Sequence, residues 1–348
     1  MELYFLDKHF AALNTPLDTM TSVVWSLRYY SCGTFTVVFP GCDSAIAEIA
    51  SAAVYLCDRR HCGRIEYVSV TEDGIELRGK LLECLLSDRL LRGNVAYSGT
   101  ITEVVLAVLQ DTLGDLPVEI APNQPVFDTK VTFSGSWEPL GDWLYDNLRP
   151  YGISYTVQYD AGANKGIFRL RSGVDRSYDG QDEDNSVEMA VFSEEFGNIA
   201  SLTYEKHLGD VRSRVYVEGG DGMIVTVESS TDGDIREIHK KAADLKESDF
   251  HDKDSYIAAL TVRGQQRLEE CTPQIRLDCT AEGDAQPRYG IGYDLGDTCE
   301  IQSVPLGISI RTQLTGLDIV YENGVEQLYP CFGDEITDIR RLINKLNK

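Results

Sequence analysis

Residues 21–40, TSVVWSLRYYSCGTFTVVFP, constrain the possible folds more than any other stretch of the chain. Large apolar side chains occupy every second position on both sides of Cys32-Gly33, and this period of two places successive side chains on opposite faces of a β-strand. Glycine can take a positive φ in the turn, and Pro40 ends the second strand because proline has no N–H for the ladder. The stretch therefore predicts a β-hairpin. Its aromatic and aliphatic face consists of Trp25, Leu27, Tyr29, Phe35, Val37 and Phe39.

The other face of this hairpin carries one cation, Arg28, among Ser26, Thr34 and Thr36. A cation held on a strand face usually meets a carboxylate or a neighbouring chain. We therefore expect an acidic partner for Arg28, either within the chain or in another copy of it.

Strand and turn patterns continue through residues 2–96. The turn Glu72-Asp73-Gly74 separates two alternating runs, and Asp-Gly in this position is a strong hairpin signal. Residues 45–57, AIAEIASAAVYLC, fit either a short helix or a strand. The succession of hairpins predicts a small barrel-like β-domain over residues 1–97.

The periodicity then changes to that of helices. Residues 99–114 and 137–152 carry apolar side chains at helical spacing, with Trp137 and Trp143 in the second helix. Strand-like runs lie between the helices, and two further strands, SYTVQYD and GIFRLRSG, follow them as a hairpin. This order predicts an inserted α/β domain over residues 98–196.

Residues 197–333 return to strand patterns. Gly219-Gly220-Asp221-Gly222 precedes a strand rather than a helix, so it indicates a hairpin turn and not a phosphate-binding loop. Asn323-Gly324 is a two-residue hairpin signal. We predict a second barrel-like domain over this range.

Two helices are expected in this half of the chain. Residues 256–270 have helical spacing, with Asp254 or Ser255 as the expected N-cap. Residues 334–348 form an amphipathic pattern and predict a C-terminal helix. The predicted class is thus mainly β, with two small barrel-like domains, an α+β insert and a C-terminal helix.

The motifs of the chain also occur in the order typical of one known family. They are Trp25, Arg28-Tyr29, Gly33-Thr34-Phe35 and Pro40, then Gly63-Arg64-Ile65-Glu66, Leu77-x-Gly79 and Leu86-x-x-Arg89, then Phe192-Ser193, Gly197-Asn198-Ile199 and Tyr204, and finally Gly296-Asp297, Arg311, Gly316-Leu317, Tyr321-x-x-Gly324 and Phe332-Gly333. In this set and order the chain resembles the tail-hub, or baseplate-hub, proteins of siphophages.

The resemblance implies a structural subunit of a phage or prophage tail. Such a protein forms a homotrimeric ring that joins the tail tube to the tail tip, and each subunit contributes two similar barrels. Its partners are copies of itself and the neighbouring tail-tube, distal tail and tail-tip proteins. It is made in the bacterial cytoplasm and becomes part of the virion tail. The strands around Arg28 and Arg311 are then expected to present edges that pair with neighbouring subunits.

The charge of the chain excludes several partners. It has 32 basic against 56 acidic residues and a net charge of -24. Proteins that hold phosphate backbones cluster Lys and Arg, so we expect no specific nucleic-acid binding and no anionic membrane surface. The apolar stretches are far shorter than the ~20 residues of a membrane span, and the N-terminus lacks the pattern of a signal peptide.

The nine cysteines are scattered and odd in number, which indicates reduced thiols rather than a disulfide framework. Cys57 and Cys62 flank the segment Asp58-Arg59-Arg60-His61, which invites a metal-site interpretation. Two arginines between the ligands would repel a metal ion, and no second ligand pair accompanies them. We therefore predict no metal there, although a role for Cys57 and Cys62 stays open.

No residue set has the spacing of a catalytic or cofactor site. The acidic run 175–195 lacks the ligand order of a calcium loop, and indicates a solvated loop. His-Glu-x-x-His, Gly-x-Ser-x-Gly and Walker motifs are missing from the sequence. The candidate bases His207, His239 and His251 have no Cys or Ser partner at a recognisable spacing. We predict no catalytic, cofactor-binding or metal-binding residues, and no enzyme.

Two alternative functions stay open. A tail-associated cell-wall glycosidase needs a carboxylate pair at a suitable separation, and a chain with 56 acidic residues has many candidates for one. A carbohydrate-binding β-module would use Trp137, Trp143 and some of the 18 tyrosines. The helical spacing of the two tryptophans favours core positions instead.

Overall fold

The computed structural model describes residues 1–180, 187–229, 235–243, 245–250, 252–281, 286–322 and 324–334. Strands dominate and form several sheets, which confirms the mainly β class. The strands are β1 (Tyr4–Leu6), β2 (Ser22–Arg28), β3 (Thr34–Pro40), β4 (Tyr55–Cys57), β5 (Cys62–Val70), β6 (Gly74–Leu81), β7 (Asn94–Thr100), β8 (Val118–Ile120), β9 (Lys130–Ser136), β10 (Ile153–Asp160), β11 (Lys165–Ser172), β12 (Val191–Ser193), β13 (Ile199–His207), β14 (Arg214–Gly219), β15 (Ile224–Glu228), β16 (Glu237–Ala242), β17 (Gln274–Ala281), β18 (Thr298–Ser303), β19 (Ile308–Glu322) and β20 (Val325–Gly333). The helices are α1 (Ser44–Ala52), α2 (Ile101–Thr112), α3 (Leu140–Leu148) and α4 (Lys253–Glu269), with short 3₁₀ helices η1 (Leu82–Asp88), η2 (Arg149–Tyr151) and η3 (Glu247–Asp249).

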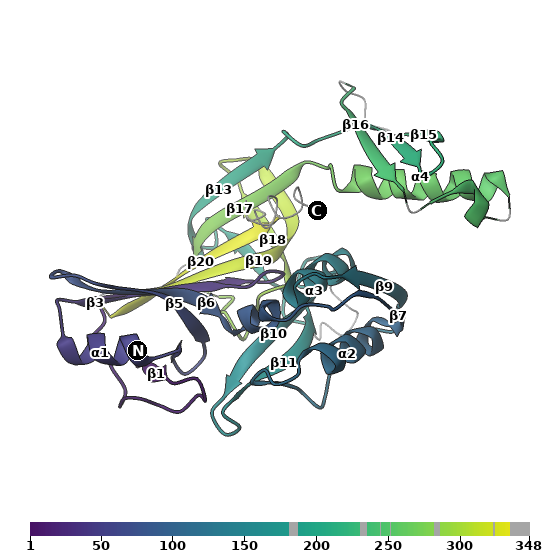
Figure 1. Ribbon diagram of the computed structural model, residues 1–348. Helices are drawn as coiled ribbons and strands as arrows, with labels where there is room; N and C mark the ends of the chain where they lie inside the picture. Colours follow the sequence, from purple (N-terminus) through teal and green to yellow (C-terminus); the bar gives the residue numbers. More distant parts are fainter. Residues whose placement is uncertain are drawn as a thin grey trace. The chain divides into compact units, whose positions relative to one another are not determined.

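The predicted hairpin, β2–β3, lies in the middle of a 12-stranded sheet (Figure 1). The strand order is β1-β4-β5-β6-β3-β2-β19-β20-β17-β13, and β12 joins through β18, which pairs with β19. Within the described residues this path is open from β1 to β13, and neither predicted barrel-like region closes on itself.

The expected free edge at Arg28 is wrong. Its strand β2 pairs on one side with β3 and on the other with β19, so both neighbours come from the same chain. At Arg311, strand β19 pairs with β18. The pairing of β2 with β19 joins strands that are far apart in sequence, so a local pattern does not reveal it, whereas β18 and β19 form a local hairpin.

The apolar face of the hairpin is buried as predicted. None of its six residues exceeds 8% exposure, and the Trp25 and Phe35 rings lie 5.3 Å apart between centroids. Gly33 is needed for a different reason than the one expected, since its φ is not positive. A Cβ at Gly33 would lie 2.5 Å from the Ser26 carbonyl oxygen and 2.6 Å from Leu81 Cδ1. Close packing therefore explains the glycine.

Strand β19 connects the two ends of the chain. Its first part, from Ile308 to Gln313, pairs with β18, and its second part, from Gly316 to Glu322, lies between β2 and β20. The predicted hairpin at residues 323–324 is confirmed by the pairing of Glu322 with Val325. One sheet thus contains strands from both regions that the sequence assigned to separate barrels.

Residues 45–57 contain both of the elements that the sequence allowed. Asp43 caps helix α1 by accepting hydrogen bonds from the N–H groups of Ala45 and Ile46, and strand β4 follows the helix. The turn at 72–74 joins β5 and β6 as predicted.

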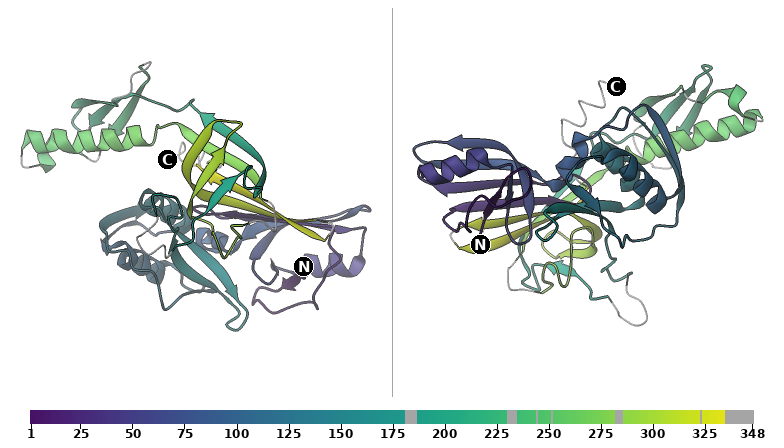
Figure 2. Two further views of the ribbon diagram at one scale, coloured as in Figure 1. Left: turned by 180° about the vertical axis from the view of Figure 1, so that it is seen from behind. Right: turned by 60° about the horizontal axis from the view of Figure 1, so that its bottom comes forward.

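Helices α2 and α3 pack beside two smaller sheets, β7–β9 and β10-β11-β8 (Figure 2). The helix predicted over 99–114 is α2, and a capping box between Thr100 and Glu103 fixes its start. Trp143 is buried in α3 as expected. The placement of Trp137 on the same stripe is wrong, because Trp137 precedes the helix at φ 51° and is 64% exposed.

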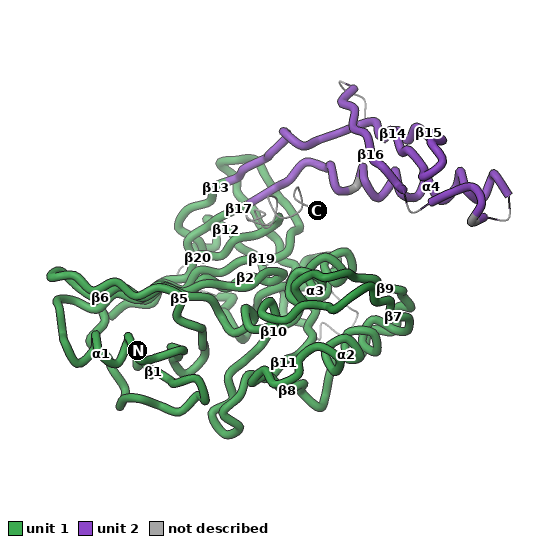
Figure 3. Tube along the Cα trace, viewed as in Figure 1, with its two compact units in different colours: residues 1–203, 277–348 green, residues 204–276 purple. Residues whose placement is uncertain are grey.

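The chain separates into two compact units, residues 1–203 with 277–348, and residues 204–276 (Figure 3). The second unit packs α4 against the sheet β15-β14-β16 around its own apolar core. The turn Gly219–Gly222 is a hairpin turn as predicted. Helix α4 begins earlier than expected, because Asp252 rather than Asp254 or Ser255 is its N-cap. The division at 97, 196 and 333 stays a prediction, and the predicted C-terminal helix falls on residues 335–348, outside the described residues, apart from Asp334.

Candidate functional site

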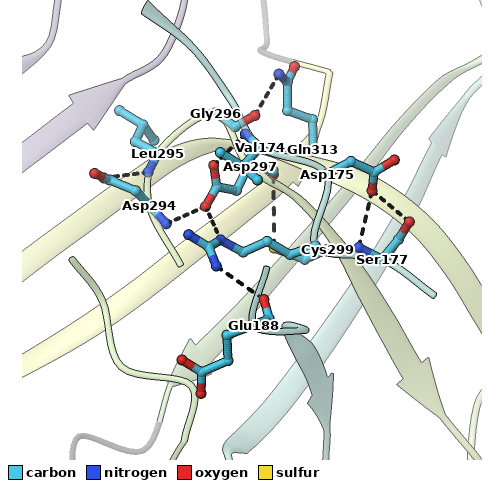
Figure 4. A network of polar contacts seen from close by, with 11 residues as sticks. Val174, Asp175, Ser177, Glu188, Asp294, Leu295, Gly296, Asp297, Cys299 and Gln313 are labelled. Carbon is cyan, nitrogen blue, oxygen red and sulfur yellow. Dashed lines mark hydrogen bonds and ion pairs between the residues drawn. The ribbon is translucent and has the colours of Figure 1, made fainter. Parts of the chain in front are cut away.

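An ion pair between Arg176 and Asp297 joins the segment that follows the β10–β11 hairpin to the start of strand β18 (Figure 4). Arg176 Nε donates to Asp297 Oδ2 at 2.6 Å, and the two side chains are 16% and 4% exposed. The same carboxylate accepts hydrogen bonds from the backbone N–H groups of Val174 at 2.7 Å and Asp294 at 2.9 Å. Both carboxylate oxygens of Asp297 therefore accept hydrogen bonds, from the Arg176 side chain and from two backbone N–H groups.

The segment around this ion pair runs along strand β18. The Arg176 N–H donates to the Thr298 carbonyl at 2.8 Å, and the Ala190 N–H donates to the Arg176 carbonyl at 3.0 Å. The Glu300 N–H then donates to the Ala190 carbonyl at 3.0 Å. Residues 176 and 190, both within the acidic run 175–195, are thus hydrogen-bonded to the large sheet.

Asp175, the first residue of the acidic run, also has its partners within the chain. Burial opposes its ionisation, but hydrogen bonds from Ser177 and the charge of Arg311 outweigh burial and hold the pKa of Asp175 below its ordinary value. Arg311 forms an ion pair with this carboxylate. Residues 181–186 of the run lie outside the described residues, so the solvated loop stays a prediction there.

The segment from Cys57 to Cys62 forms the turn between β4 and β5. Both cysteines are buried and directly opposite each other, and neither is in a disulfide. His61 Nδ1 lies 3.2 Å from Asp58 Oδ2. Over the described ranges, no group of three or more His, Cys, Asp or Glu side chains could hold a metal ion.

The other candidate residues do not come together. His207 and His239 contact the carboxylates of Glu205 and Glu218, while His251 lies outside the described residues. Trp137 and Trp143 differ in environment, one exposed and one in the core. Among the site candidates that fall on described residues, the structure therefore brings Cys57 and Cys62 together.

The face of the large sheet that carries Arg28 is polar, and its charged side chains form ion pairs within the chain. Arg28 Nη1 lies 2.8 Å from Asp318 Oδ1, which confirms the expected carboxylate partner within the chain. On neighbouring strands Arg78 pairs with Glu76 at 2.7 Å, and Lys80 with Glu66 at 3.8 Å. Cations on this face are matched by nearby carboxylates.

Sequence reasoning missed three exposed apolar side chains on the two turns that follow β12 and β18, Phe196, Val304 and Leu306, here called the turn cluster. These side chains are 63%, 68% and 49% exposed. Phe196 follows β12, the other two follow β18, and the two strands are parallel with Ser193 opposite Gln302. A hydrogen bond of 2.8 Å from Ser303 Oγ to Glu194 Oε2 joins the two turns. The apolar turn Val304-Pro305-Leu306-Gly307 was the available signal, because turns are commonly polar.

The sequence of residues 1–334 matches the family model of the siphovirus ReqiPepy6 Gp37-like proteins. The chain belongs to this family. The match covers nearly the whole chain and confirms its place among siphovirus tail proteins. No curated protein sequence is significantly similar to the chain.

Solved tail proteins share the fold over their whole lengths. The 43 kDa tail protein of prophage MuSo2 from Shewanella oneidensis aligns with a TM-score of 0.60 at 11% identity, over 95% of this chain and 97% of that one. A tail protein from Neisseria meningitidis gives 0.62 at 13% identity, over 96% of each chain. Prophage tail protein gp18 from Listeria monocytogenes gives 0.56 at 12% identity, over 100% and 98%. At such identities these matches show the fold alone.

None of the helices in the described part of the chain is both long enough and apolar enough to cross a bilayer.

Proposed function

We propose that the chain is a structural subunit of a phage or prophage tail hub, and that three copies form a ring between the tail tube and the tail tip. The observation that carries the proposal is the agreement of the fold with tail proteins along almost the full length of both chains. Membership of a siphovirus tail family supports the same role. Neighbouring tail-tube, distal tail and tail-tip proteins are the proposed partners, and the virion tail is the proposed location.

The open sheet gives a physical reason for a ring. Strand β13 is the last strand of its path, and most side chains of β13 after Ile199 are exposed. Unpaired strand edges invite further pairing, and a closed ring uses such edges without producing a fibre. We therefore place a subunit contact at β13 rather than at Arg28, whose strand is already paired on both sides.

The turn cluster is the second part of the proposed contact. Its three exposed apolar side chains project from turns, where a neighbouring subunit can cover them. The paired polar face around Arg28 and the net charge of -24 fit a surface that faces a channel and does not hold DNA. No catalytic role is part of this proposal.

The test of this contact uses one substitution and a matched control. Val304→Glu places a charge in the turn cluster and should lower the amount of trimer at least tenfold, as measured by native mass spectrometry at fixed protein concentration. Val126→Glu changes an equally exposed valine, 73% accessible, outside the cluster and should leave the trimer unchanged. Equal effects of both variants, with both folded by circular dichroism, would refute the turn cluster as a contact.

A carbohydrate-binding role is a second candidate, favoured only by the exposure of Trp137. An indole ring that is exposed at the surface can stack on a sugar ring. Binding to purified cell wall, lost in Trp137→Ala and kept in Tyr151→Ala, would support that role. If the native chain does not bind cell wall, the carbohydrate-binding role is refuted and the tail-hub proposal remains.

A further inference from the structure

Cys57 and Cys62 occupy a special position in the β4–β5 ladder. They are opposite each other in the antiparallel register, and the hydrogen bonds on both sides fix which kind of pair they form. The Asp58 N–H donates to the His61 carbonyl at 2.9 Å, and the Ile65 N–H donates to the Val54 carbonyl at 2.9 Å. Because hydrogen-bonded and non-hydrogen-bonded pairs alternate, the Cys57–Cys62 pair is of the second kind.

This kind of pair matches the geometry of a disulfide. Opposite residues in a non-hydrogen-bonded pair have Cα atoms about 4.5 Å apart, and disulfides form at Cα separations of about 4.4–6.8 Å. Both side chains point to the same, buried face of the ladder and join one apolar core. The register therefore places the two Cα atoms in the range of separations that a disulfide needs.

We propose that Cys57 and Cys62 form a cross-strand disulfide when the protein meets a peroxide or a small disulfide oxidant. With hydrogen peroxide, one sulfur attacks the O–O bond, and a water molecule leaves as the sulfenic acid forms. The second sulfur then displaces the hydroxyl group as a second water. Two S–H bonds and one O–O bond are broken, one S–S bond and two O–H bonds form, and the thiols supply the two electrons that reduce the peroxide.

Burial sets the rate of this reaction. Burial and the neighbouring Cys57 thiol raise the pKa of Cys62 above its usual range, and the thiolate is the reactive form. The reduced pair is therefore stable in a reducing cytoplasm and oxidises slowly outside it. Exposed Cys42 reacts first but has no opposite cysteine in a ladder.

The disulfide would close the turn that carries Arg59 and Arg60. Arg59 pairs with Glu2 at 2.9 Å, and Arg60 pairs with Glu326 at 3.2 Å. The turn thus connects the N-terminal segment to the β19–β20 hairpin. A disulfide across the base of the turn would hold these two contacts in register.

The purified full chain is treated with hydrogen peroxide or oxidised glutathione. It is then unfolded, its remaining thiols are blocked, and it is digested with trypsin without reduction. Cleavage after Arg59 or Arg60 separates the two cysteines, so their peptides stay joined only through a disulfide. We expect this linked pair as the main disulfide, and an oxidised protein with a raised Tm. The rise should vanish in Cys57→Ser and persist in Cys42→Ser.

Two results would overturn the proposal. One is full alkylation of Cys57 and Cys62 after oxidant has consumed Cys42. The other is a link between Cys32 and Cys84, whose thiol raises the pKa of Cys32, with Cys57 and Cys62 still reduced. The peptide result on the native chain needs no variant, so a variant that fails to fold does not block the test.

Discussion

Glu83 is a half-buried residue whose carboxyl oxygen Oε2 is enclosed by the fold. Its Oε1 accepts hydrogen bonds from the Thr156 hydroxyl and the Val157 N–H, both at 3.2 Å, while Oε2 is buried without a partner in the described structure. Burial raises the pKa of Glu83, and the hydrogen bonds only partly oppose this rise. Burial therefore favours the protonated form of this carboxyl, which lies between η1 and β10.

This predicts a pH dependence of stability. The pKa of Glu83 is higher in the folded chain than in the unfolded chain, so protonation of Glu83 stabilises the fold. This stabilisation is fully present below the ordinary glutamate pKa and is lost as the pH rises through the folded pKa. Glu83→Gln should remove the dependence, so its free energy of unfolding relative to the native chain should increase from pH 4 to pH 7. Urea titrations at several pH values measure this difference.

The control for this prediction is Glu48→Gln, which changes an exposed carboxyl on α1. It should shift the unfolding free energy equally at all pH values, within about 0.5 kcal/mol. A difference between Glu83→Gln and the native chain that does not change with pH would contradict the assignment of a raised pKa.

Single residues also show where local patterns mislead. Gly33 suggested a positive φ, yet contact with Ser26 and Leu81 is what excludes a side chain there. Trp137 shares the spacing of the α3 stripe but precedes the helix. Local spacing reports periodicity, whereas packing against distant residues decides burial.

At the scale of elements, the hairpins follow from the sequence because alternation and turn residues are local. The β2–β3, β5–β6, β10–β11, β14–β15 and β19–β20 pairs were all predicted and are all present. The pairing of β2 with β19 was not, because Arg28 and Asp318 are 290 residues apart in sequence. No local rule selects a partner at such a separation.

The Arg176–Asp297 pair gives an element-scale prediction. Asp297→Asn leaves a largely buried guanidinium without its counter-charge and should lower the free energy of unfolding by about 3 kcal/mol. The effect arises because the segment after β11 loses the ion pair that supports its backbone hydrogen bonds to β18. Chemical denaturation followed by tryptophan fluorescence measures it.

An exposed aspartate on the same segment serves as the comparison. Asp179 lies 3.7 Å from Arg311 and is largely exposed, so Asp179→Asn should cost no more than about 1 kcal/mol. If Asp297→Asn proves as mild as Asp179→Asn, the buried pair does not hold the segment and the interpretation of the network is wrong.

At the scale of the whole molecule, strand periodicity predicted the mainly β class and motif order predicted the tail family, and both are confirmed. The candidate contact surface was less predictable. The turn cluster depends on β12 and β18 lying in parallel, and β13 becomes an outer strand only once the path of the whole sheet is known. Of the candidate site residues, only Cys57 and Cys62 could be paired from their spacing.

The mass of the native assembly tests the central claim most directly. Native mass spectrometry across protein concentration and salt should show a species of three 38.7 kDa chains that grows with concentration. Because each chain carries a net charge of -24, added salt should strengthen the ring by screening repulsion between subunits. A chain that stays monomeric at its highest soluble concentration, or that forms a stable twofold dimer through β13, would contradict the account.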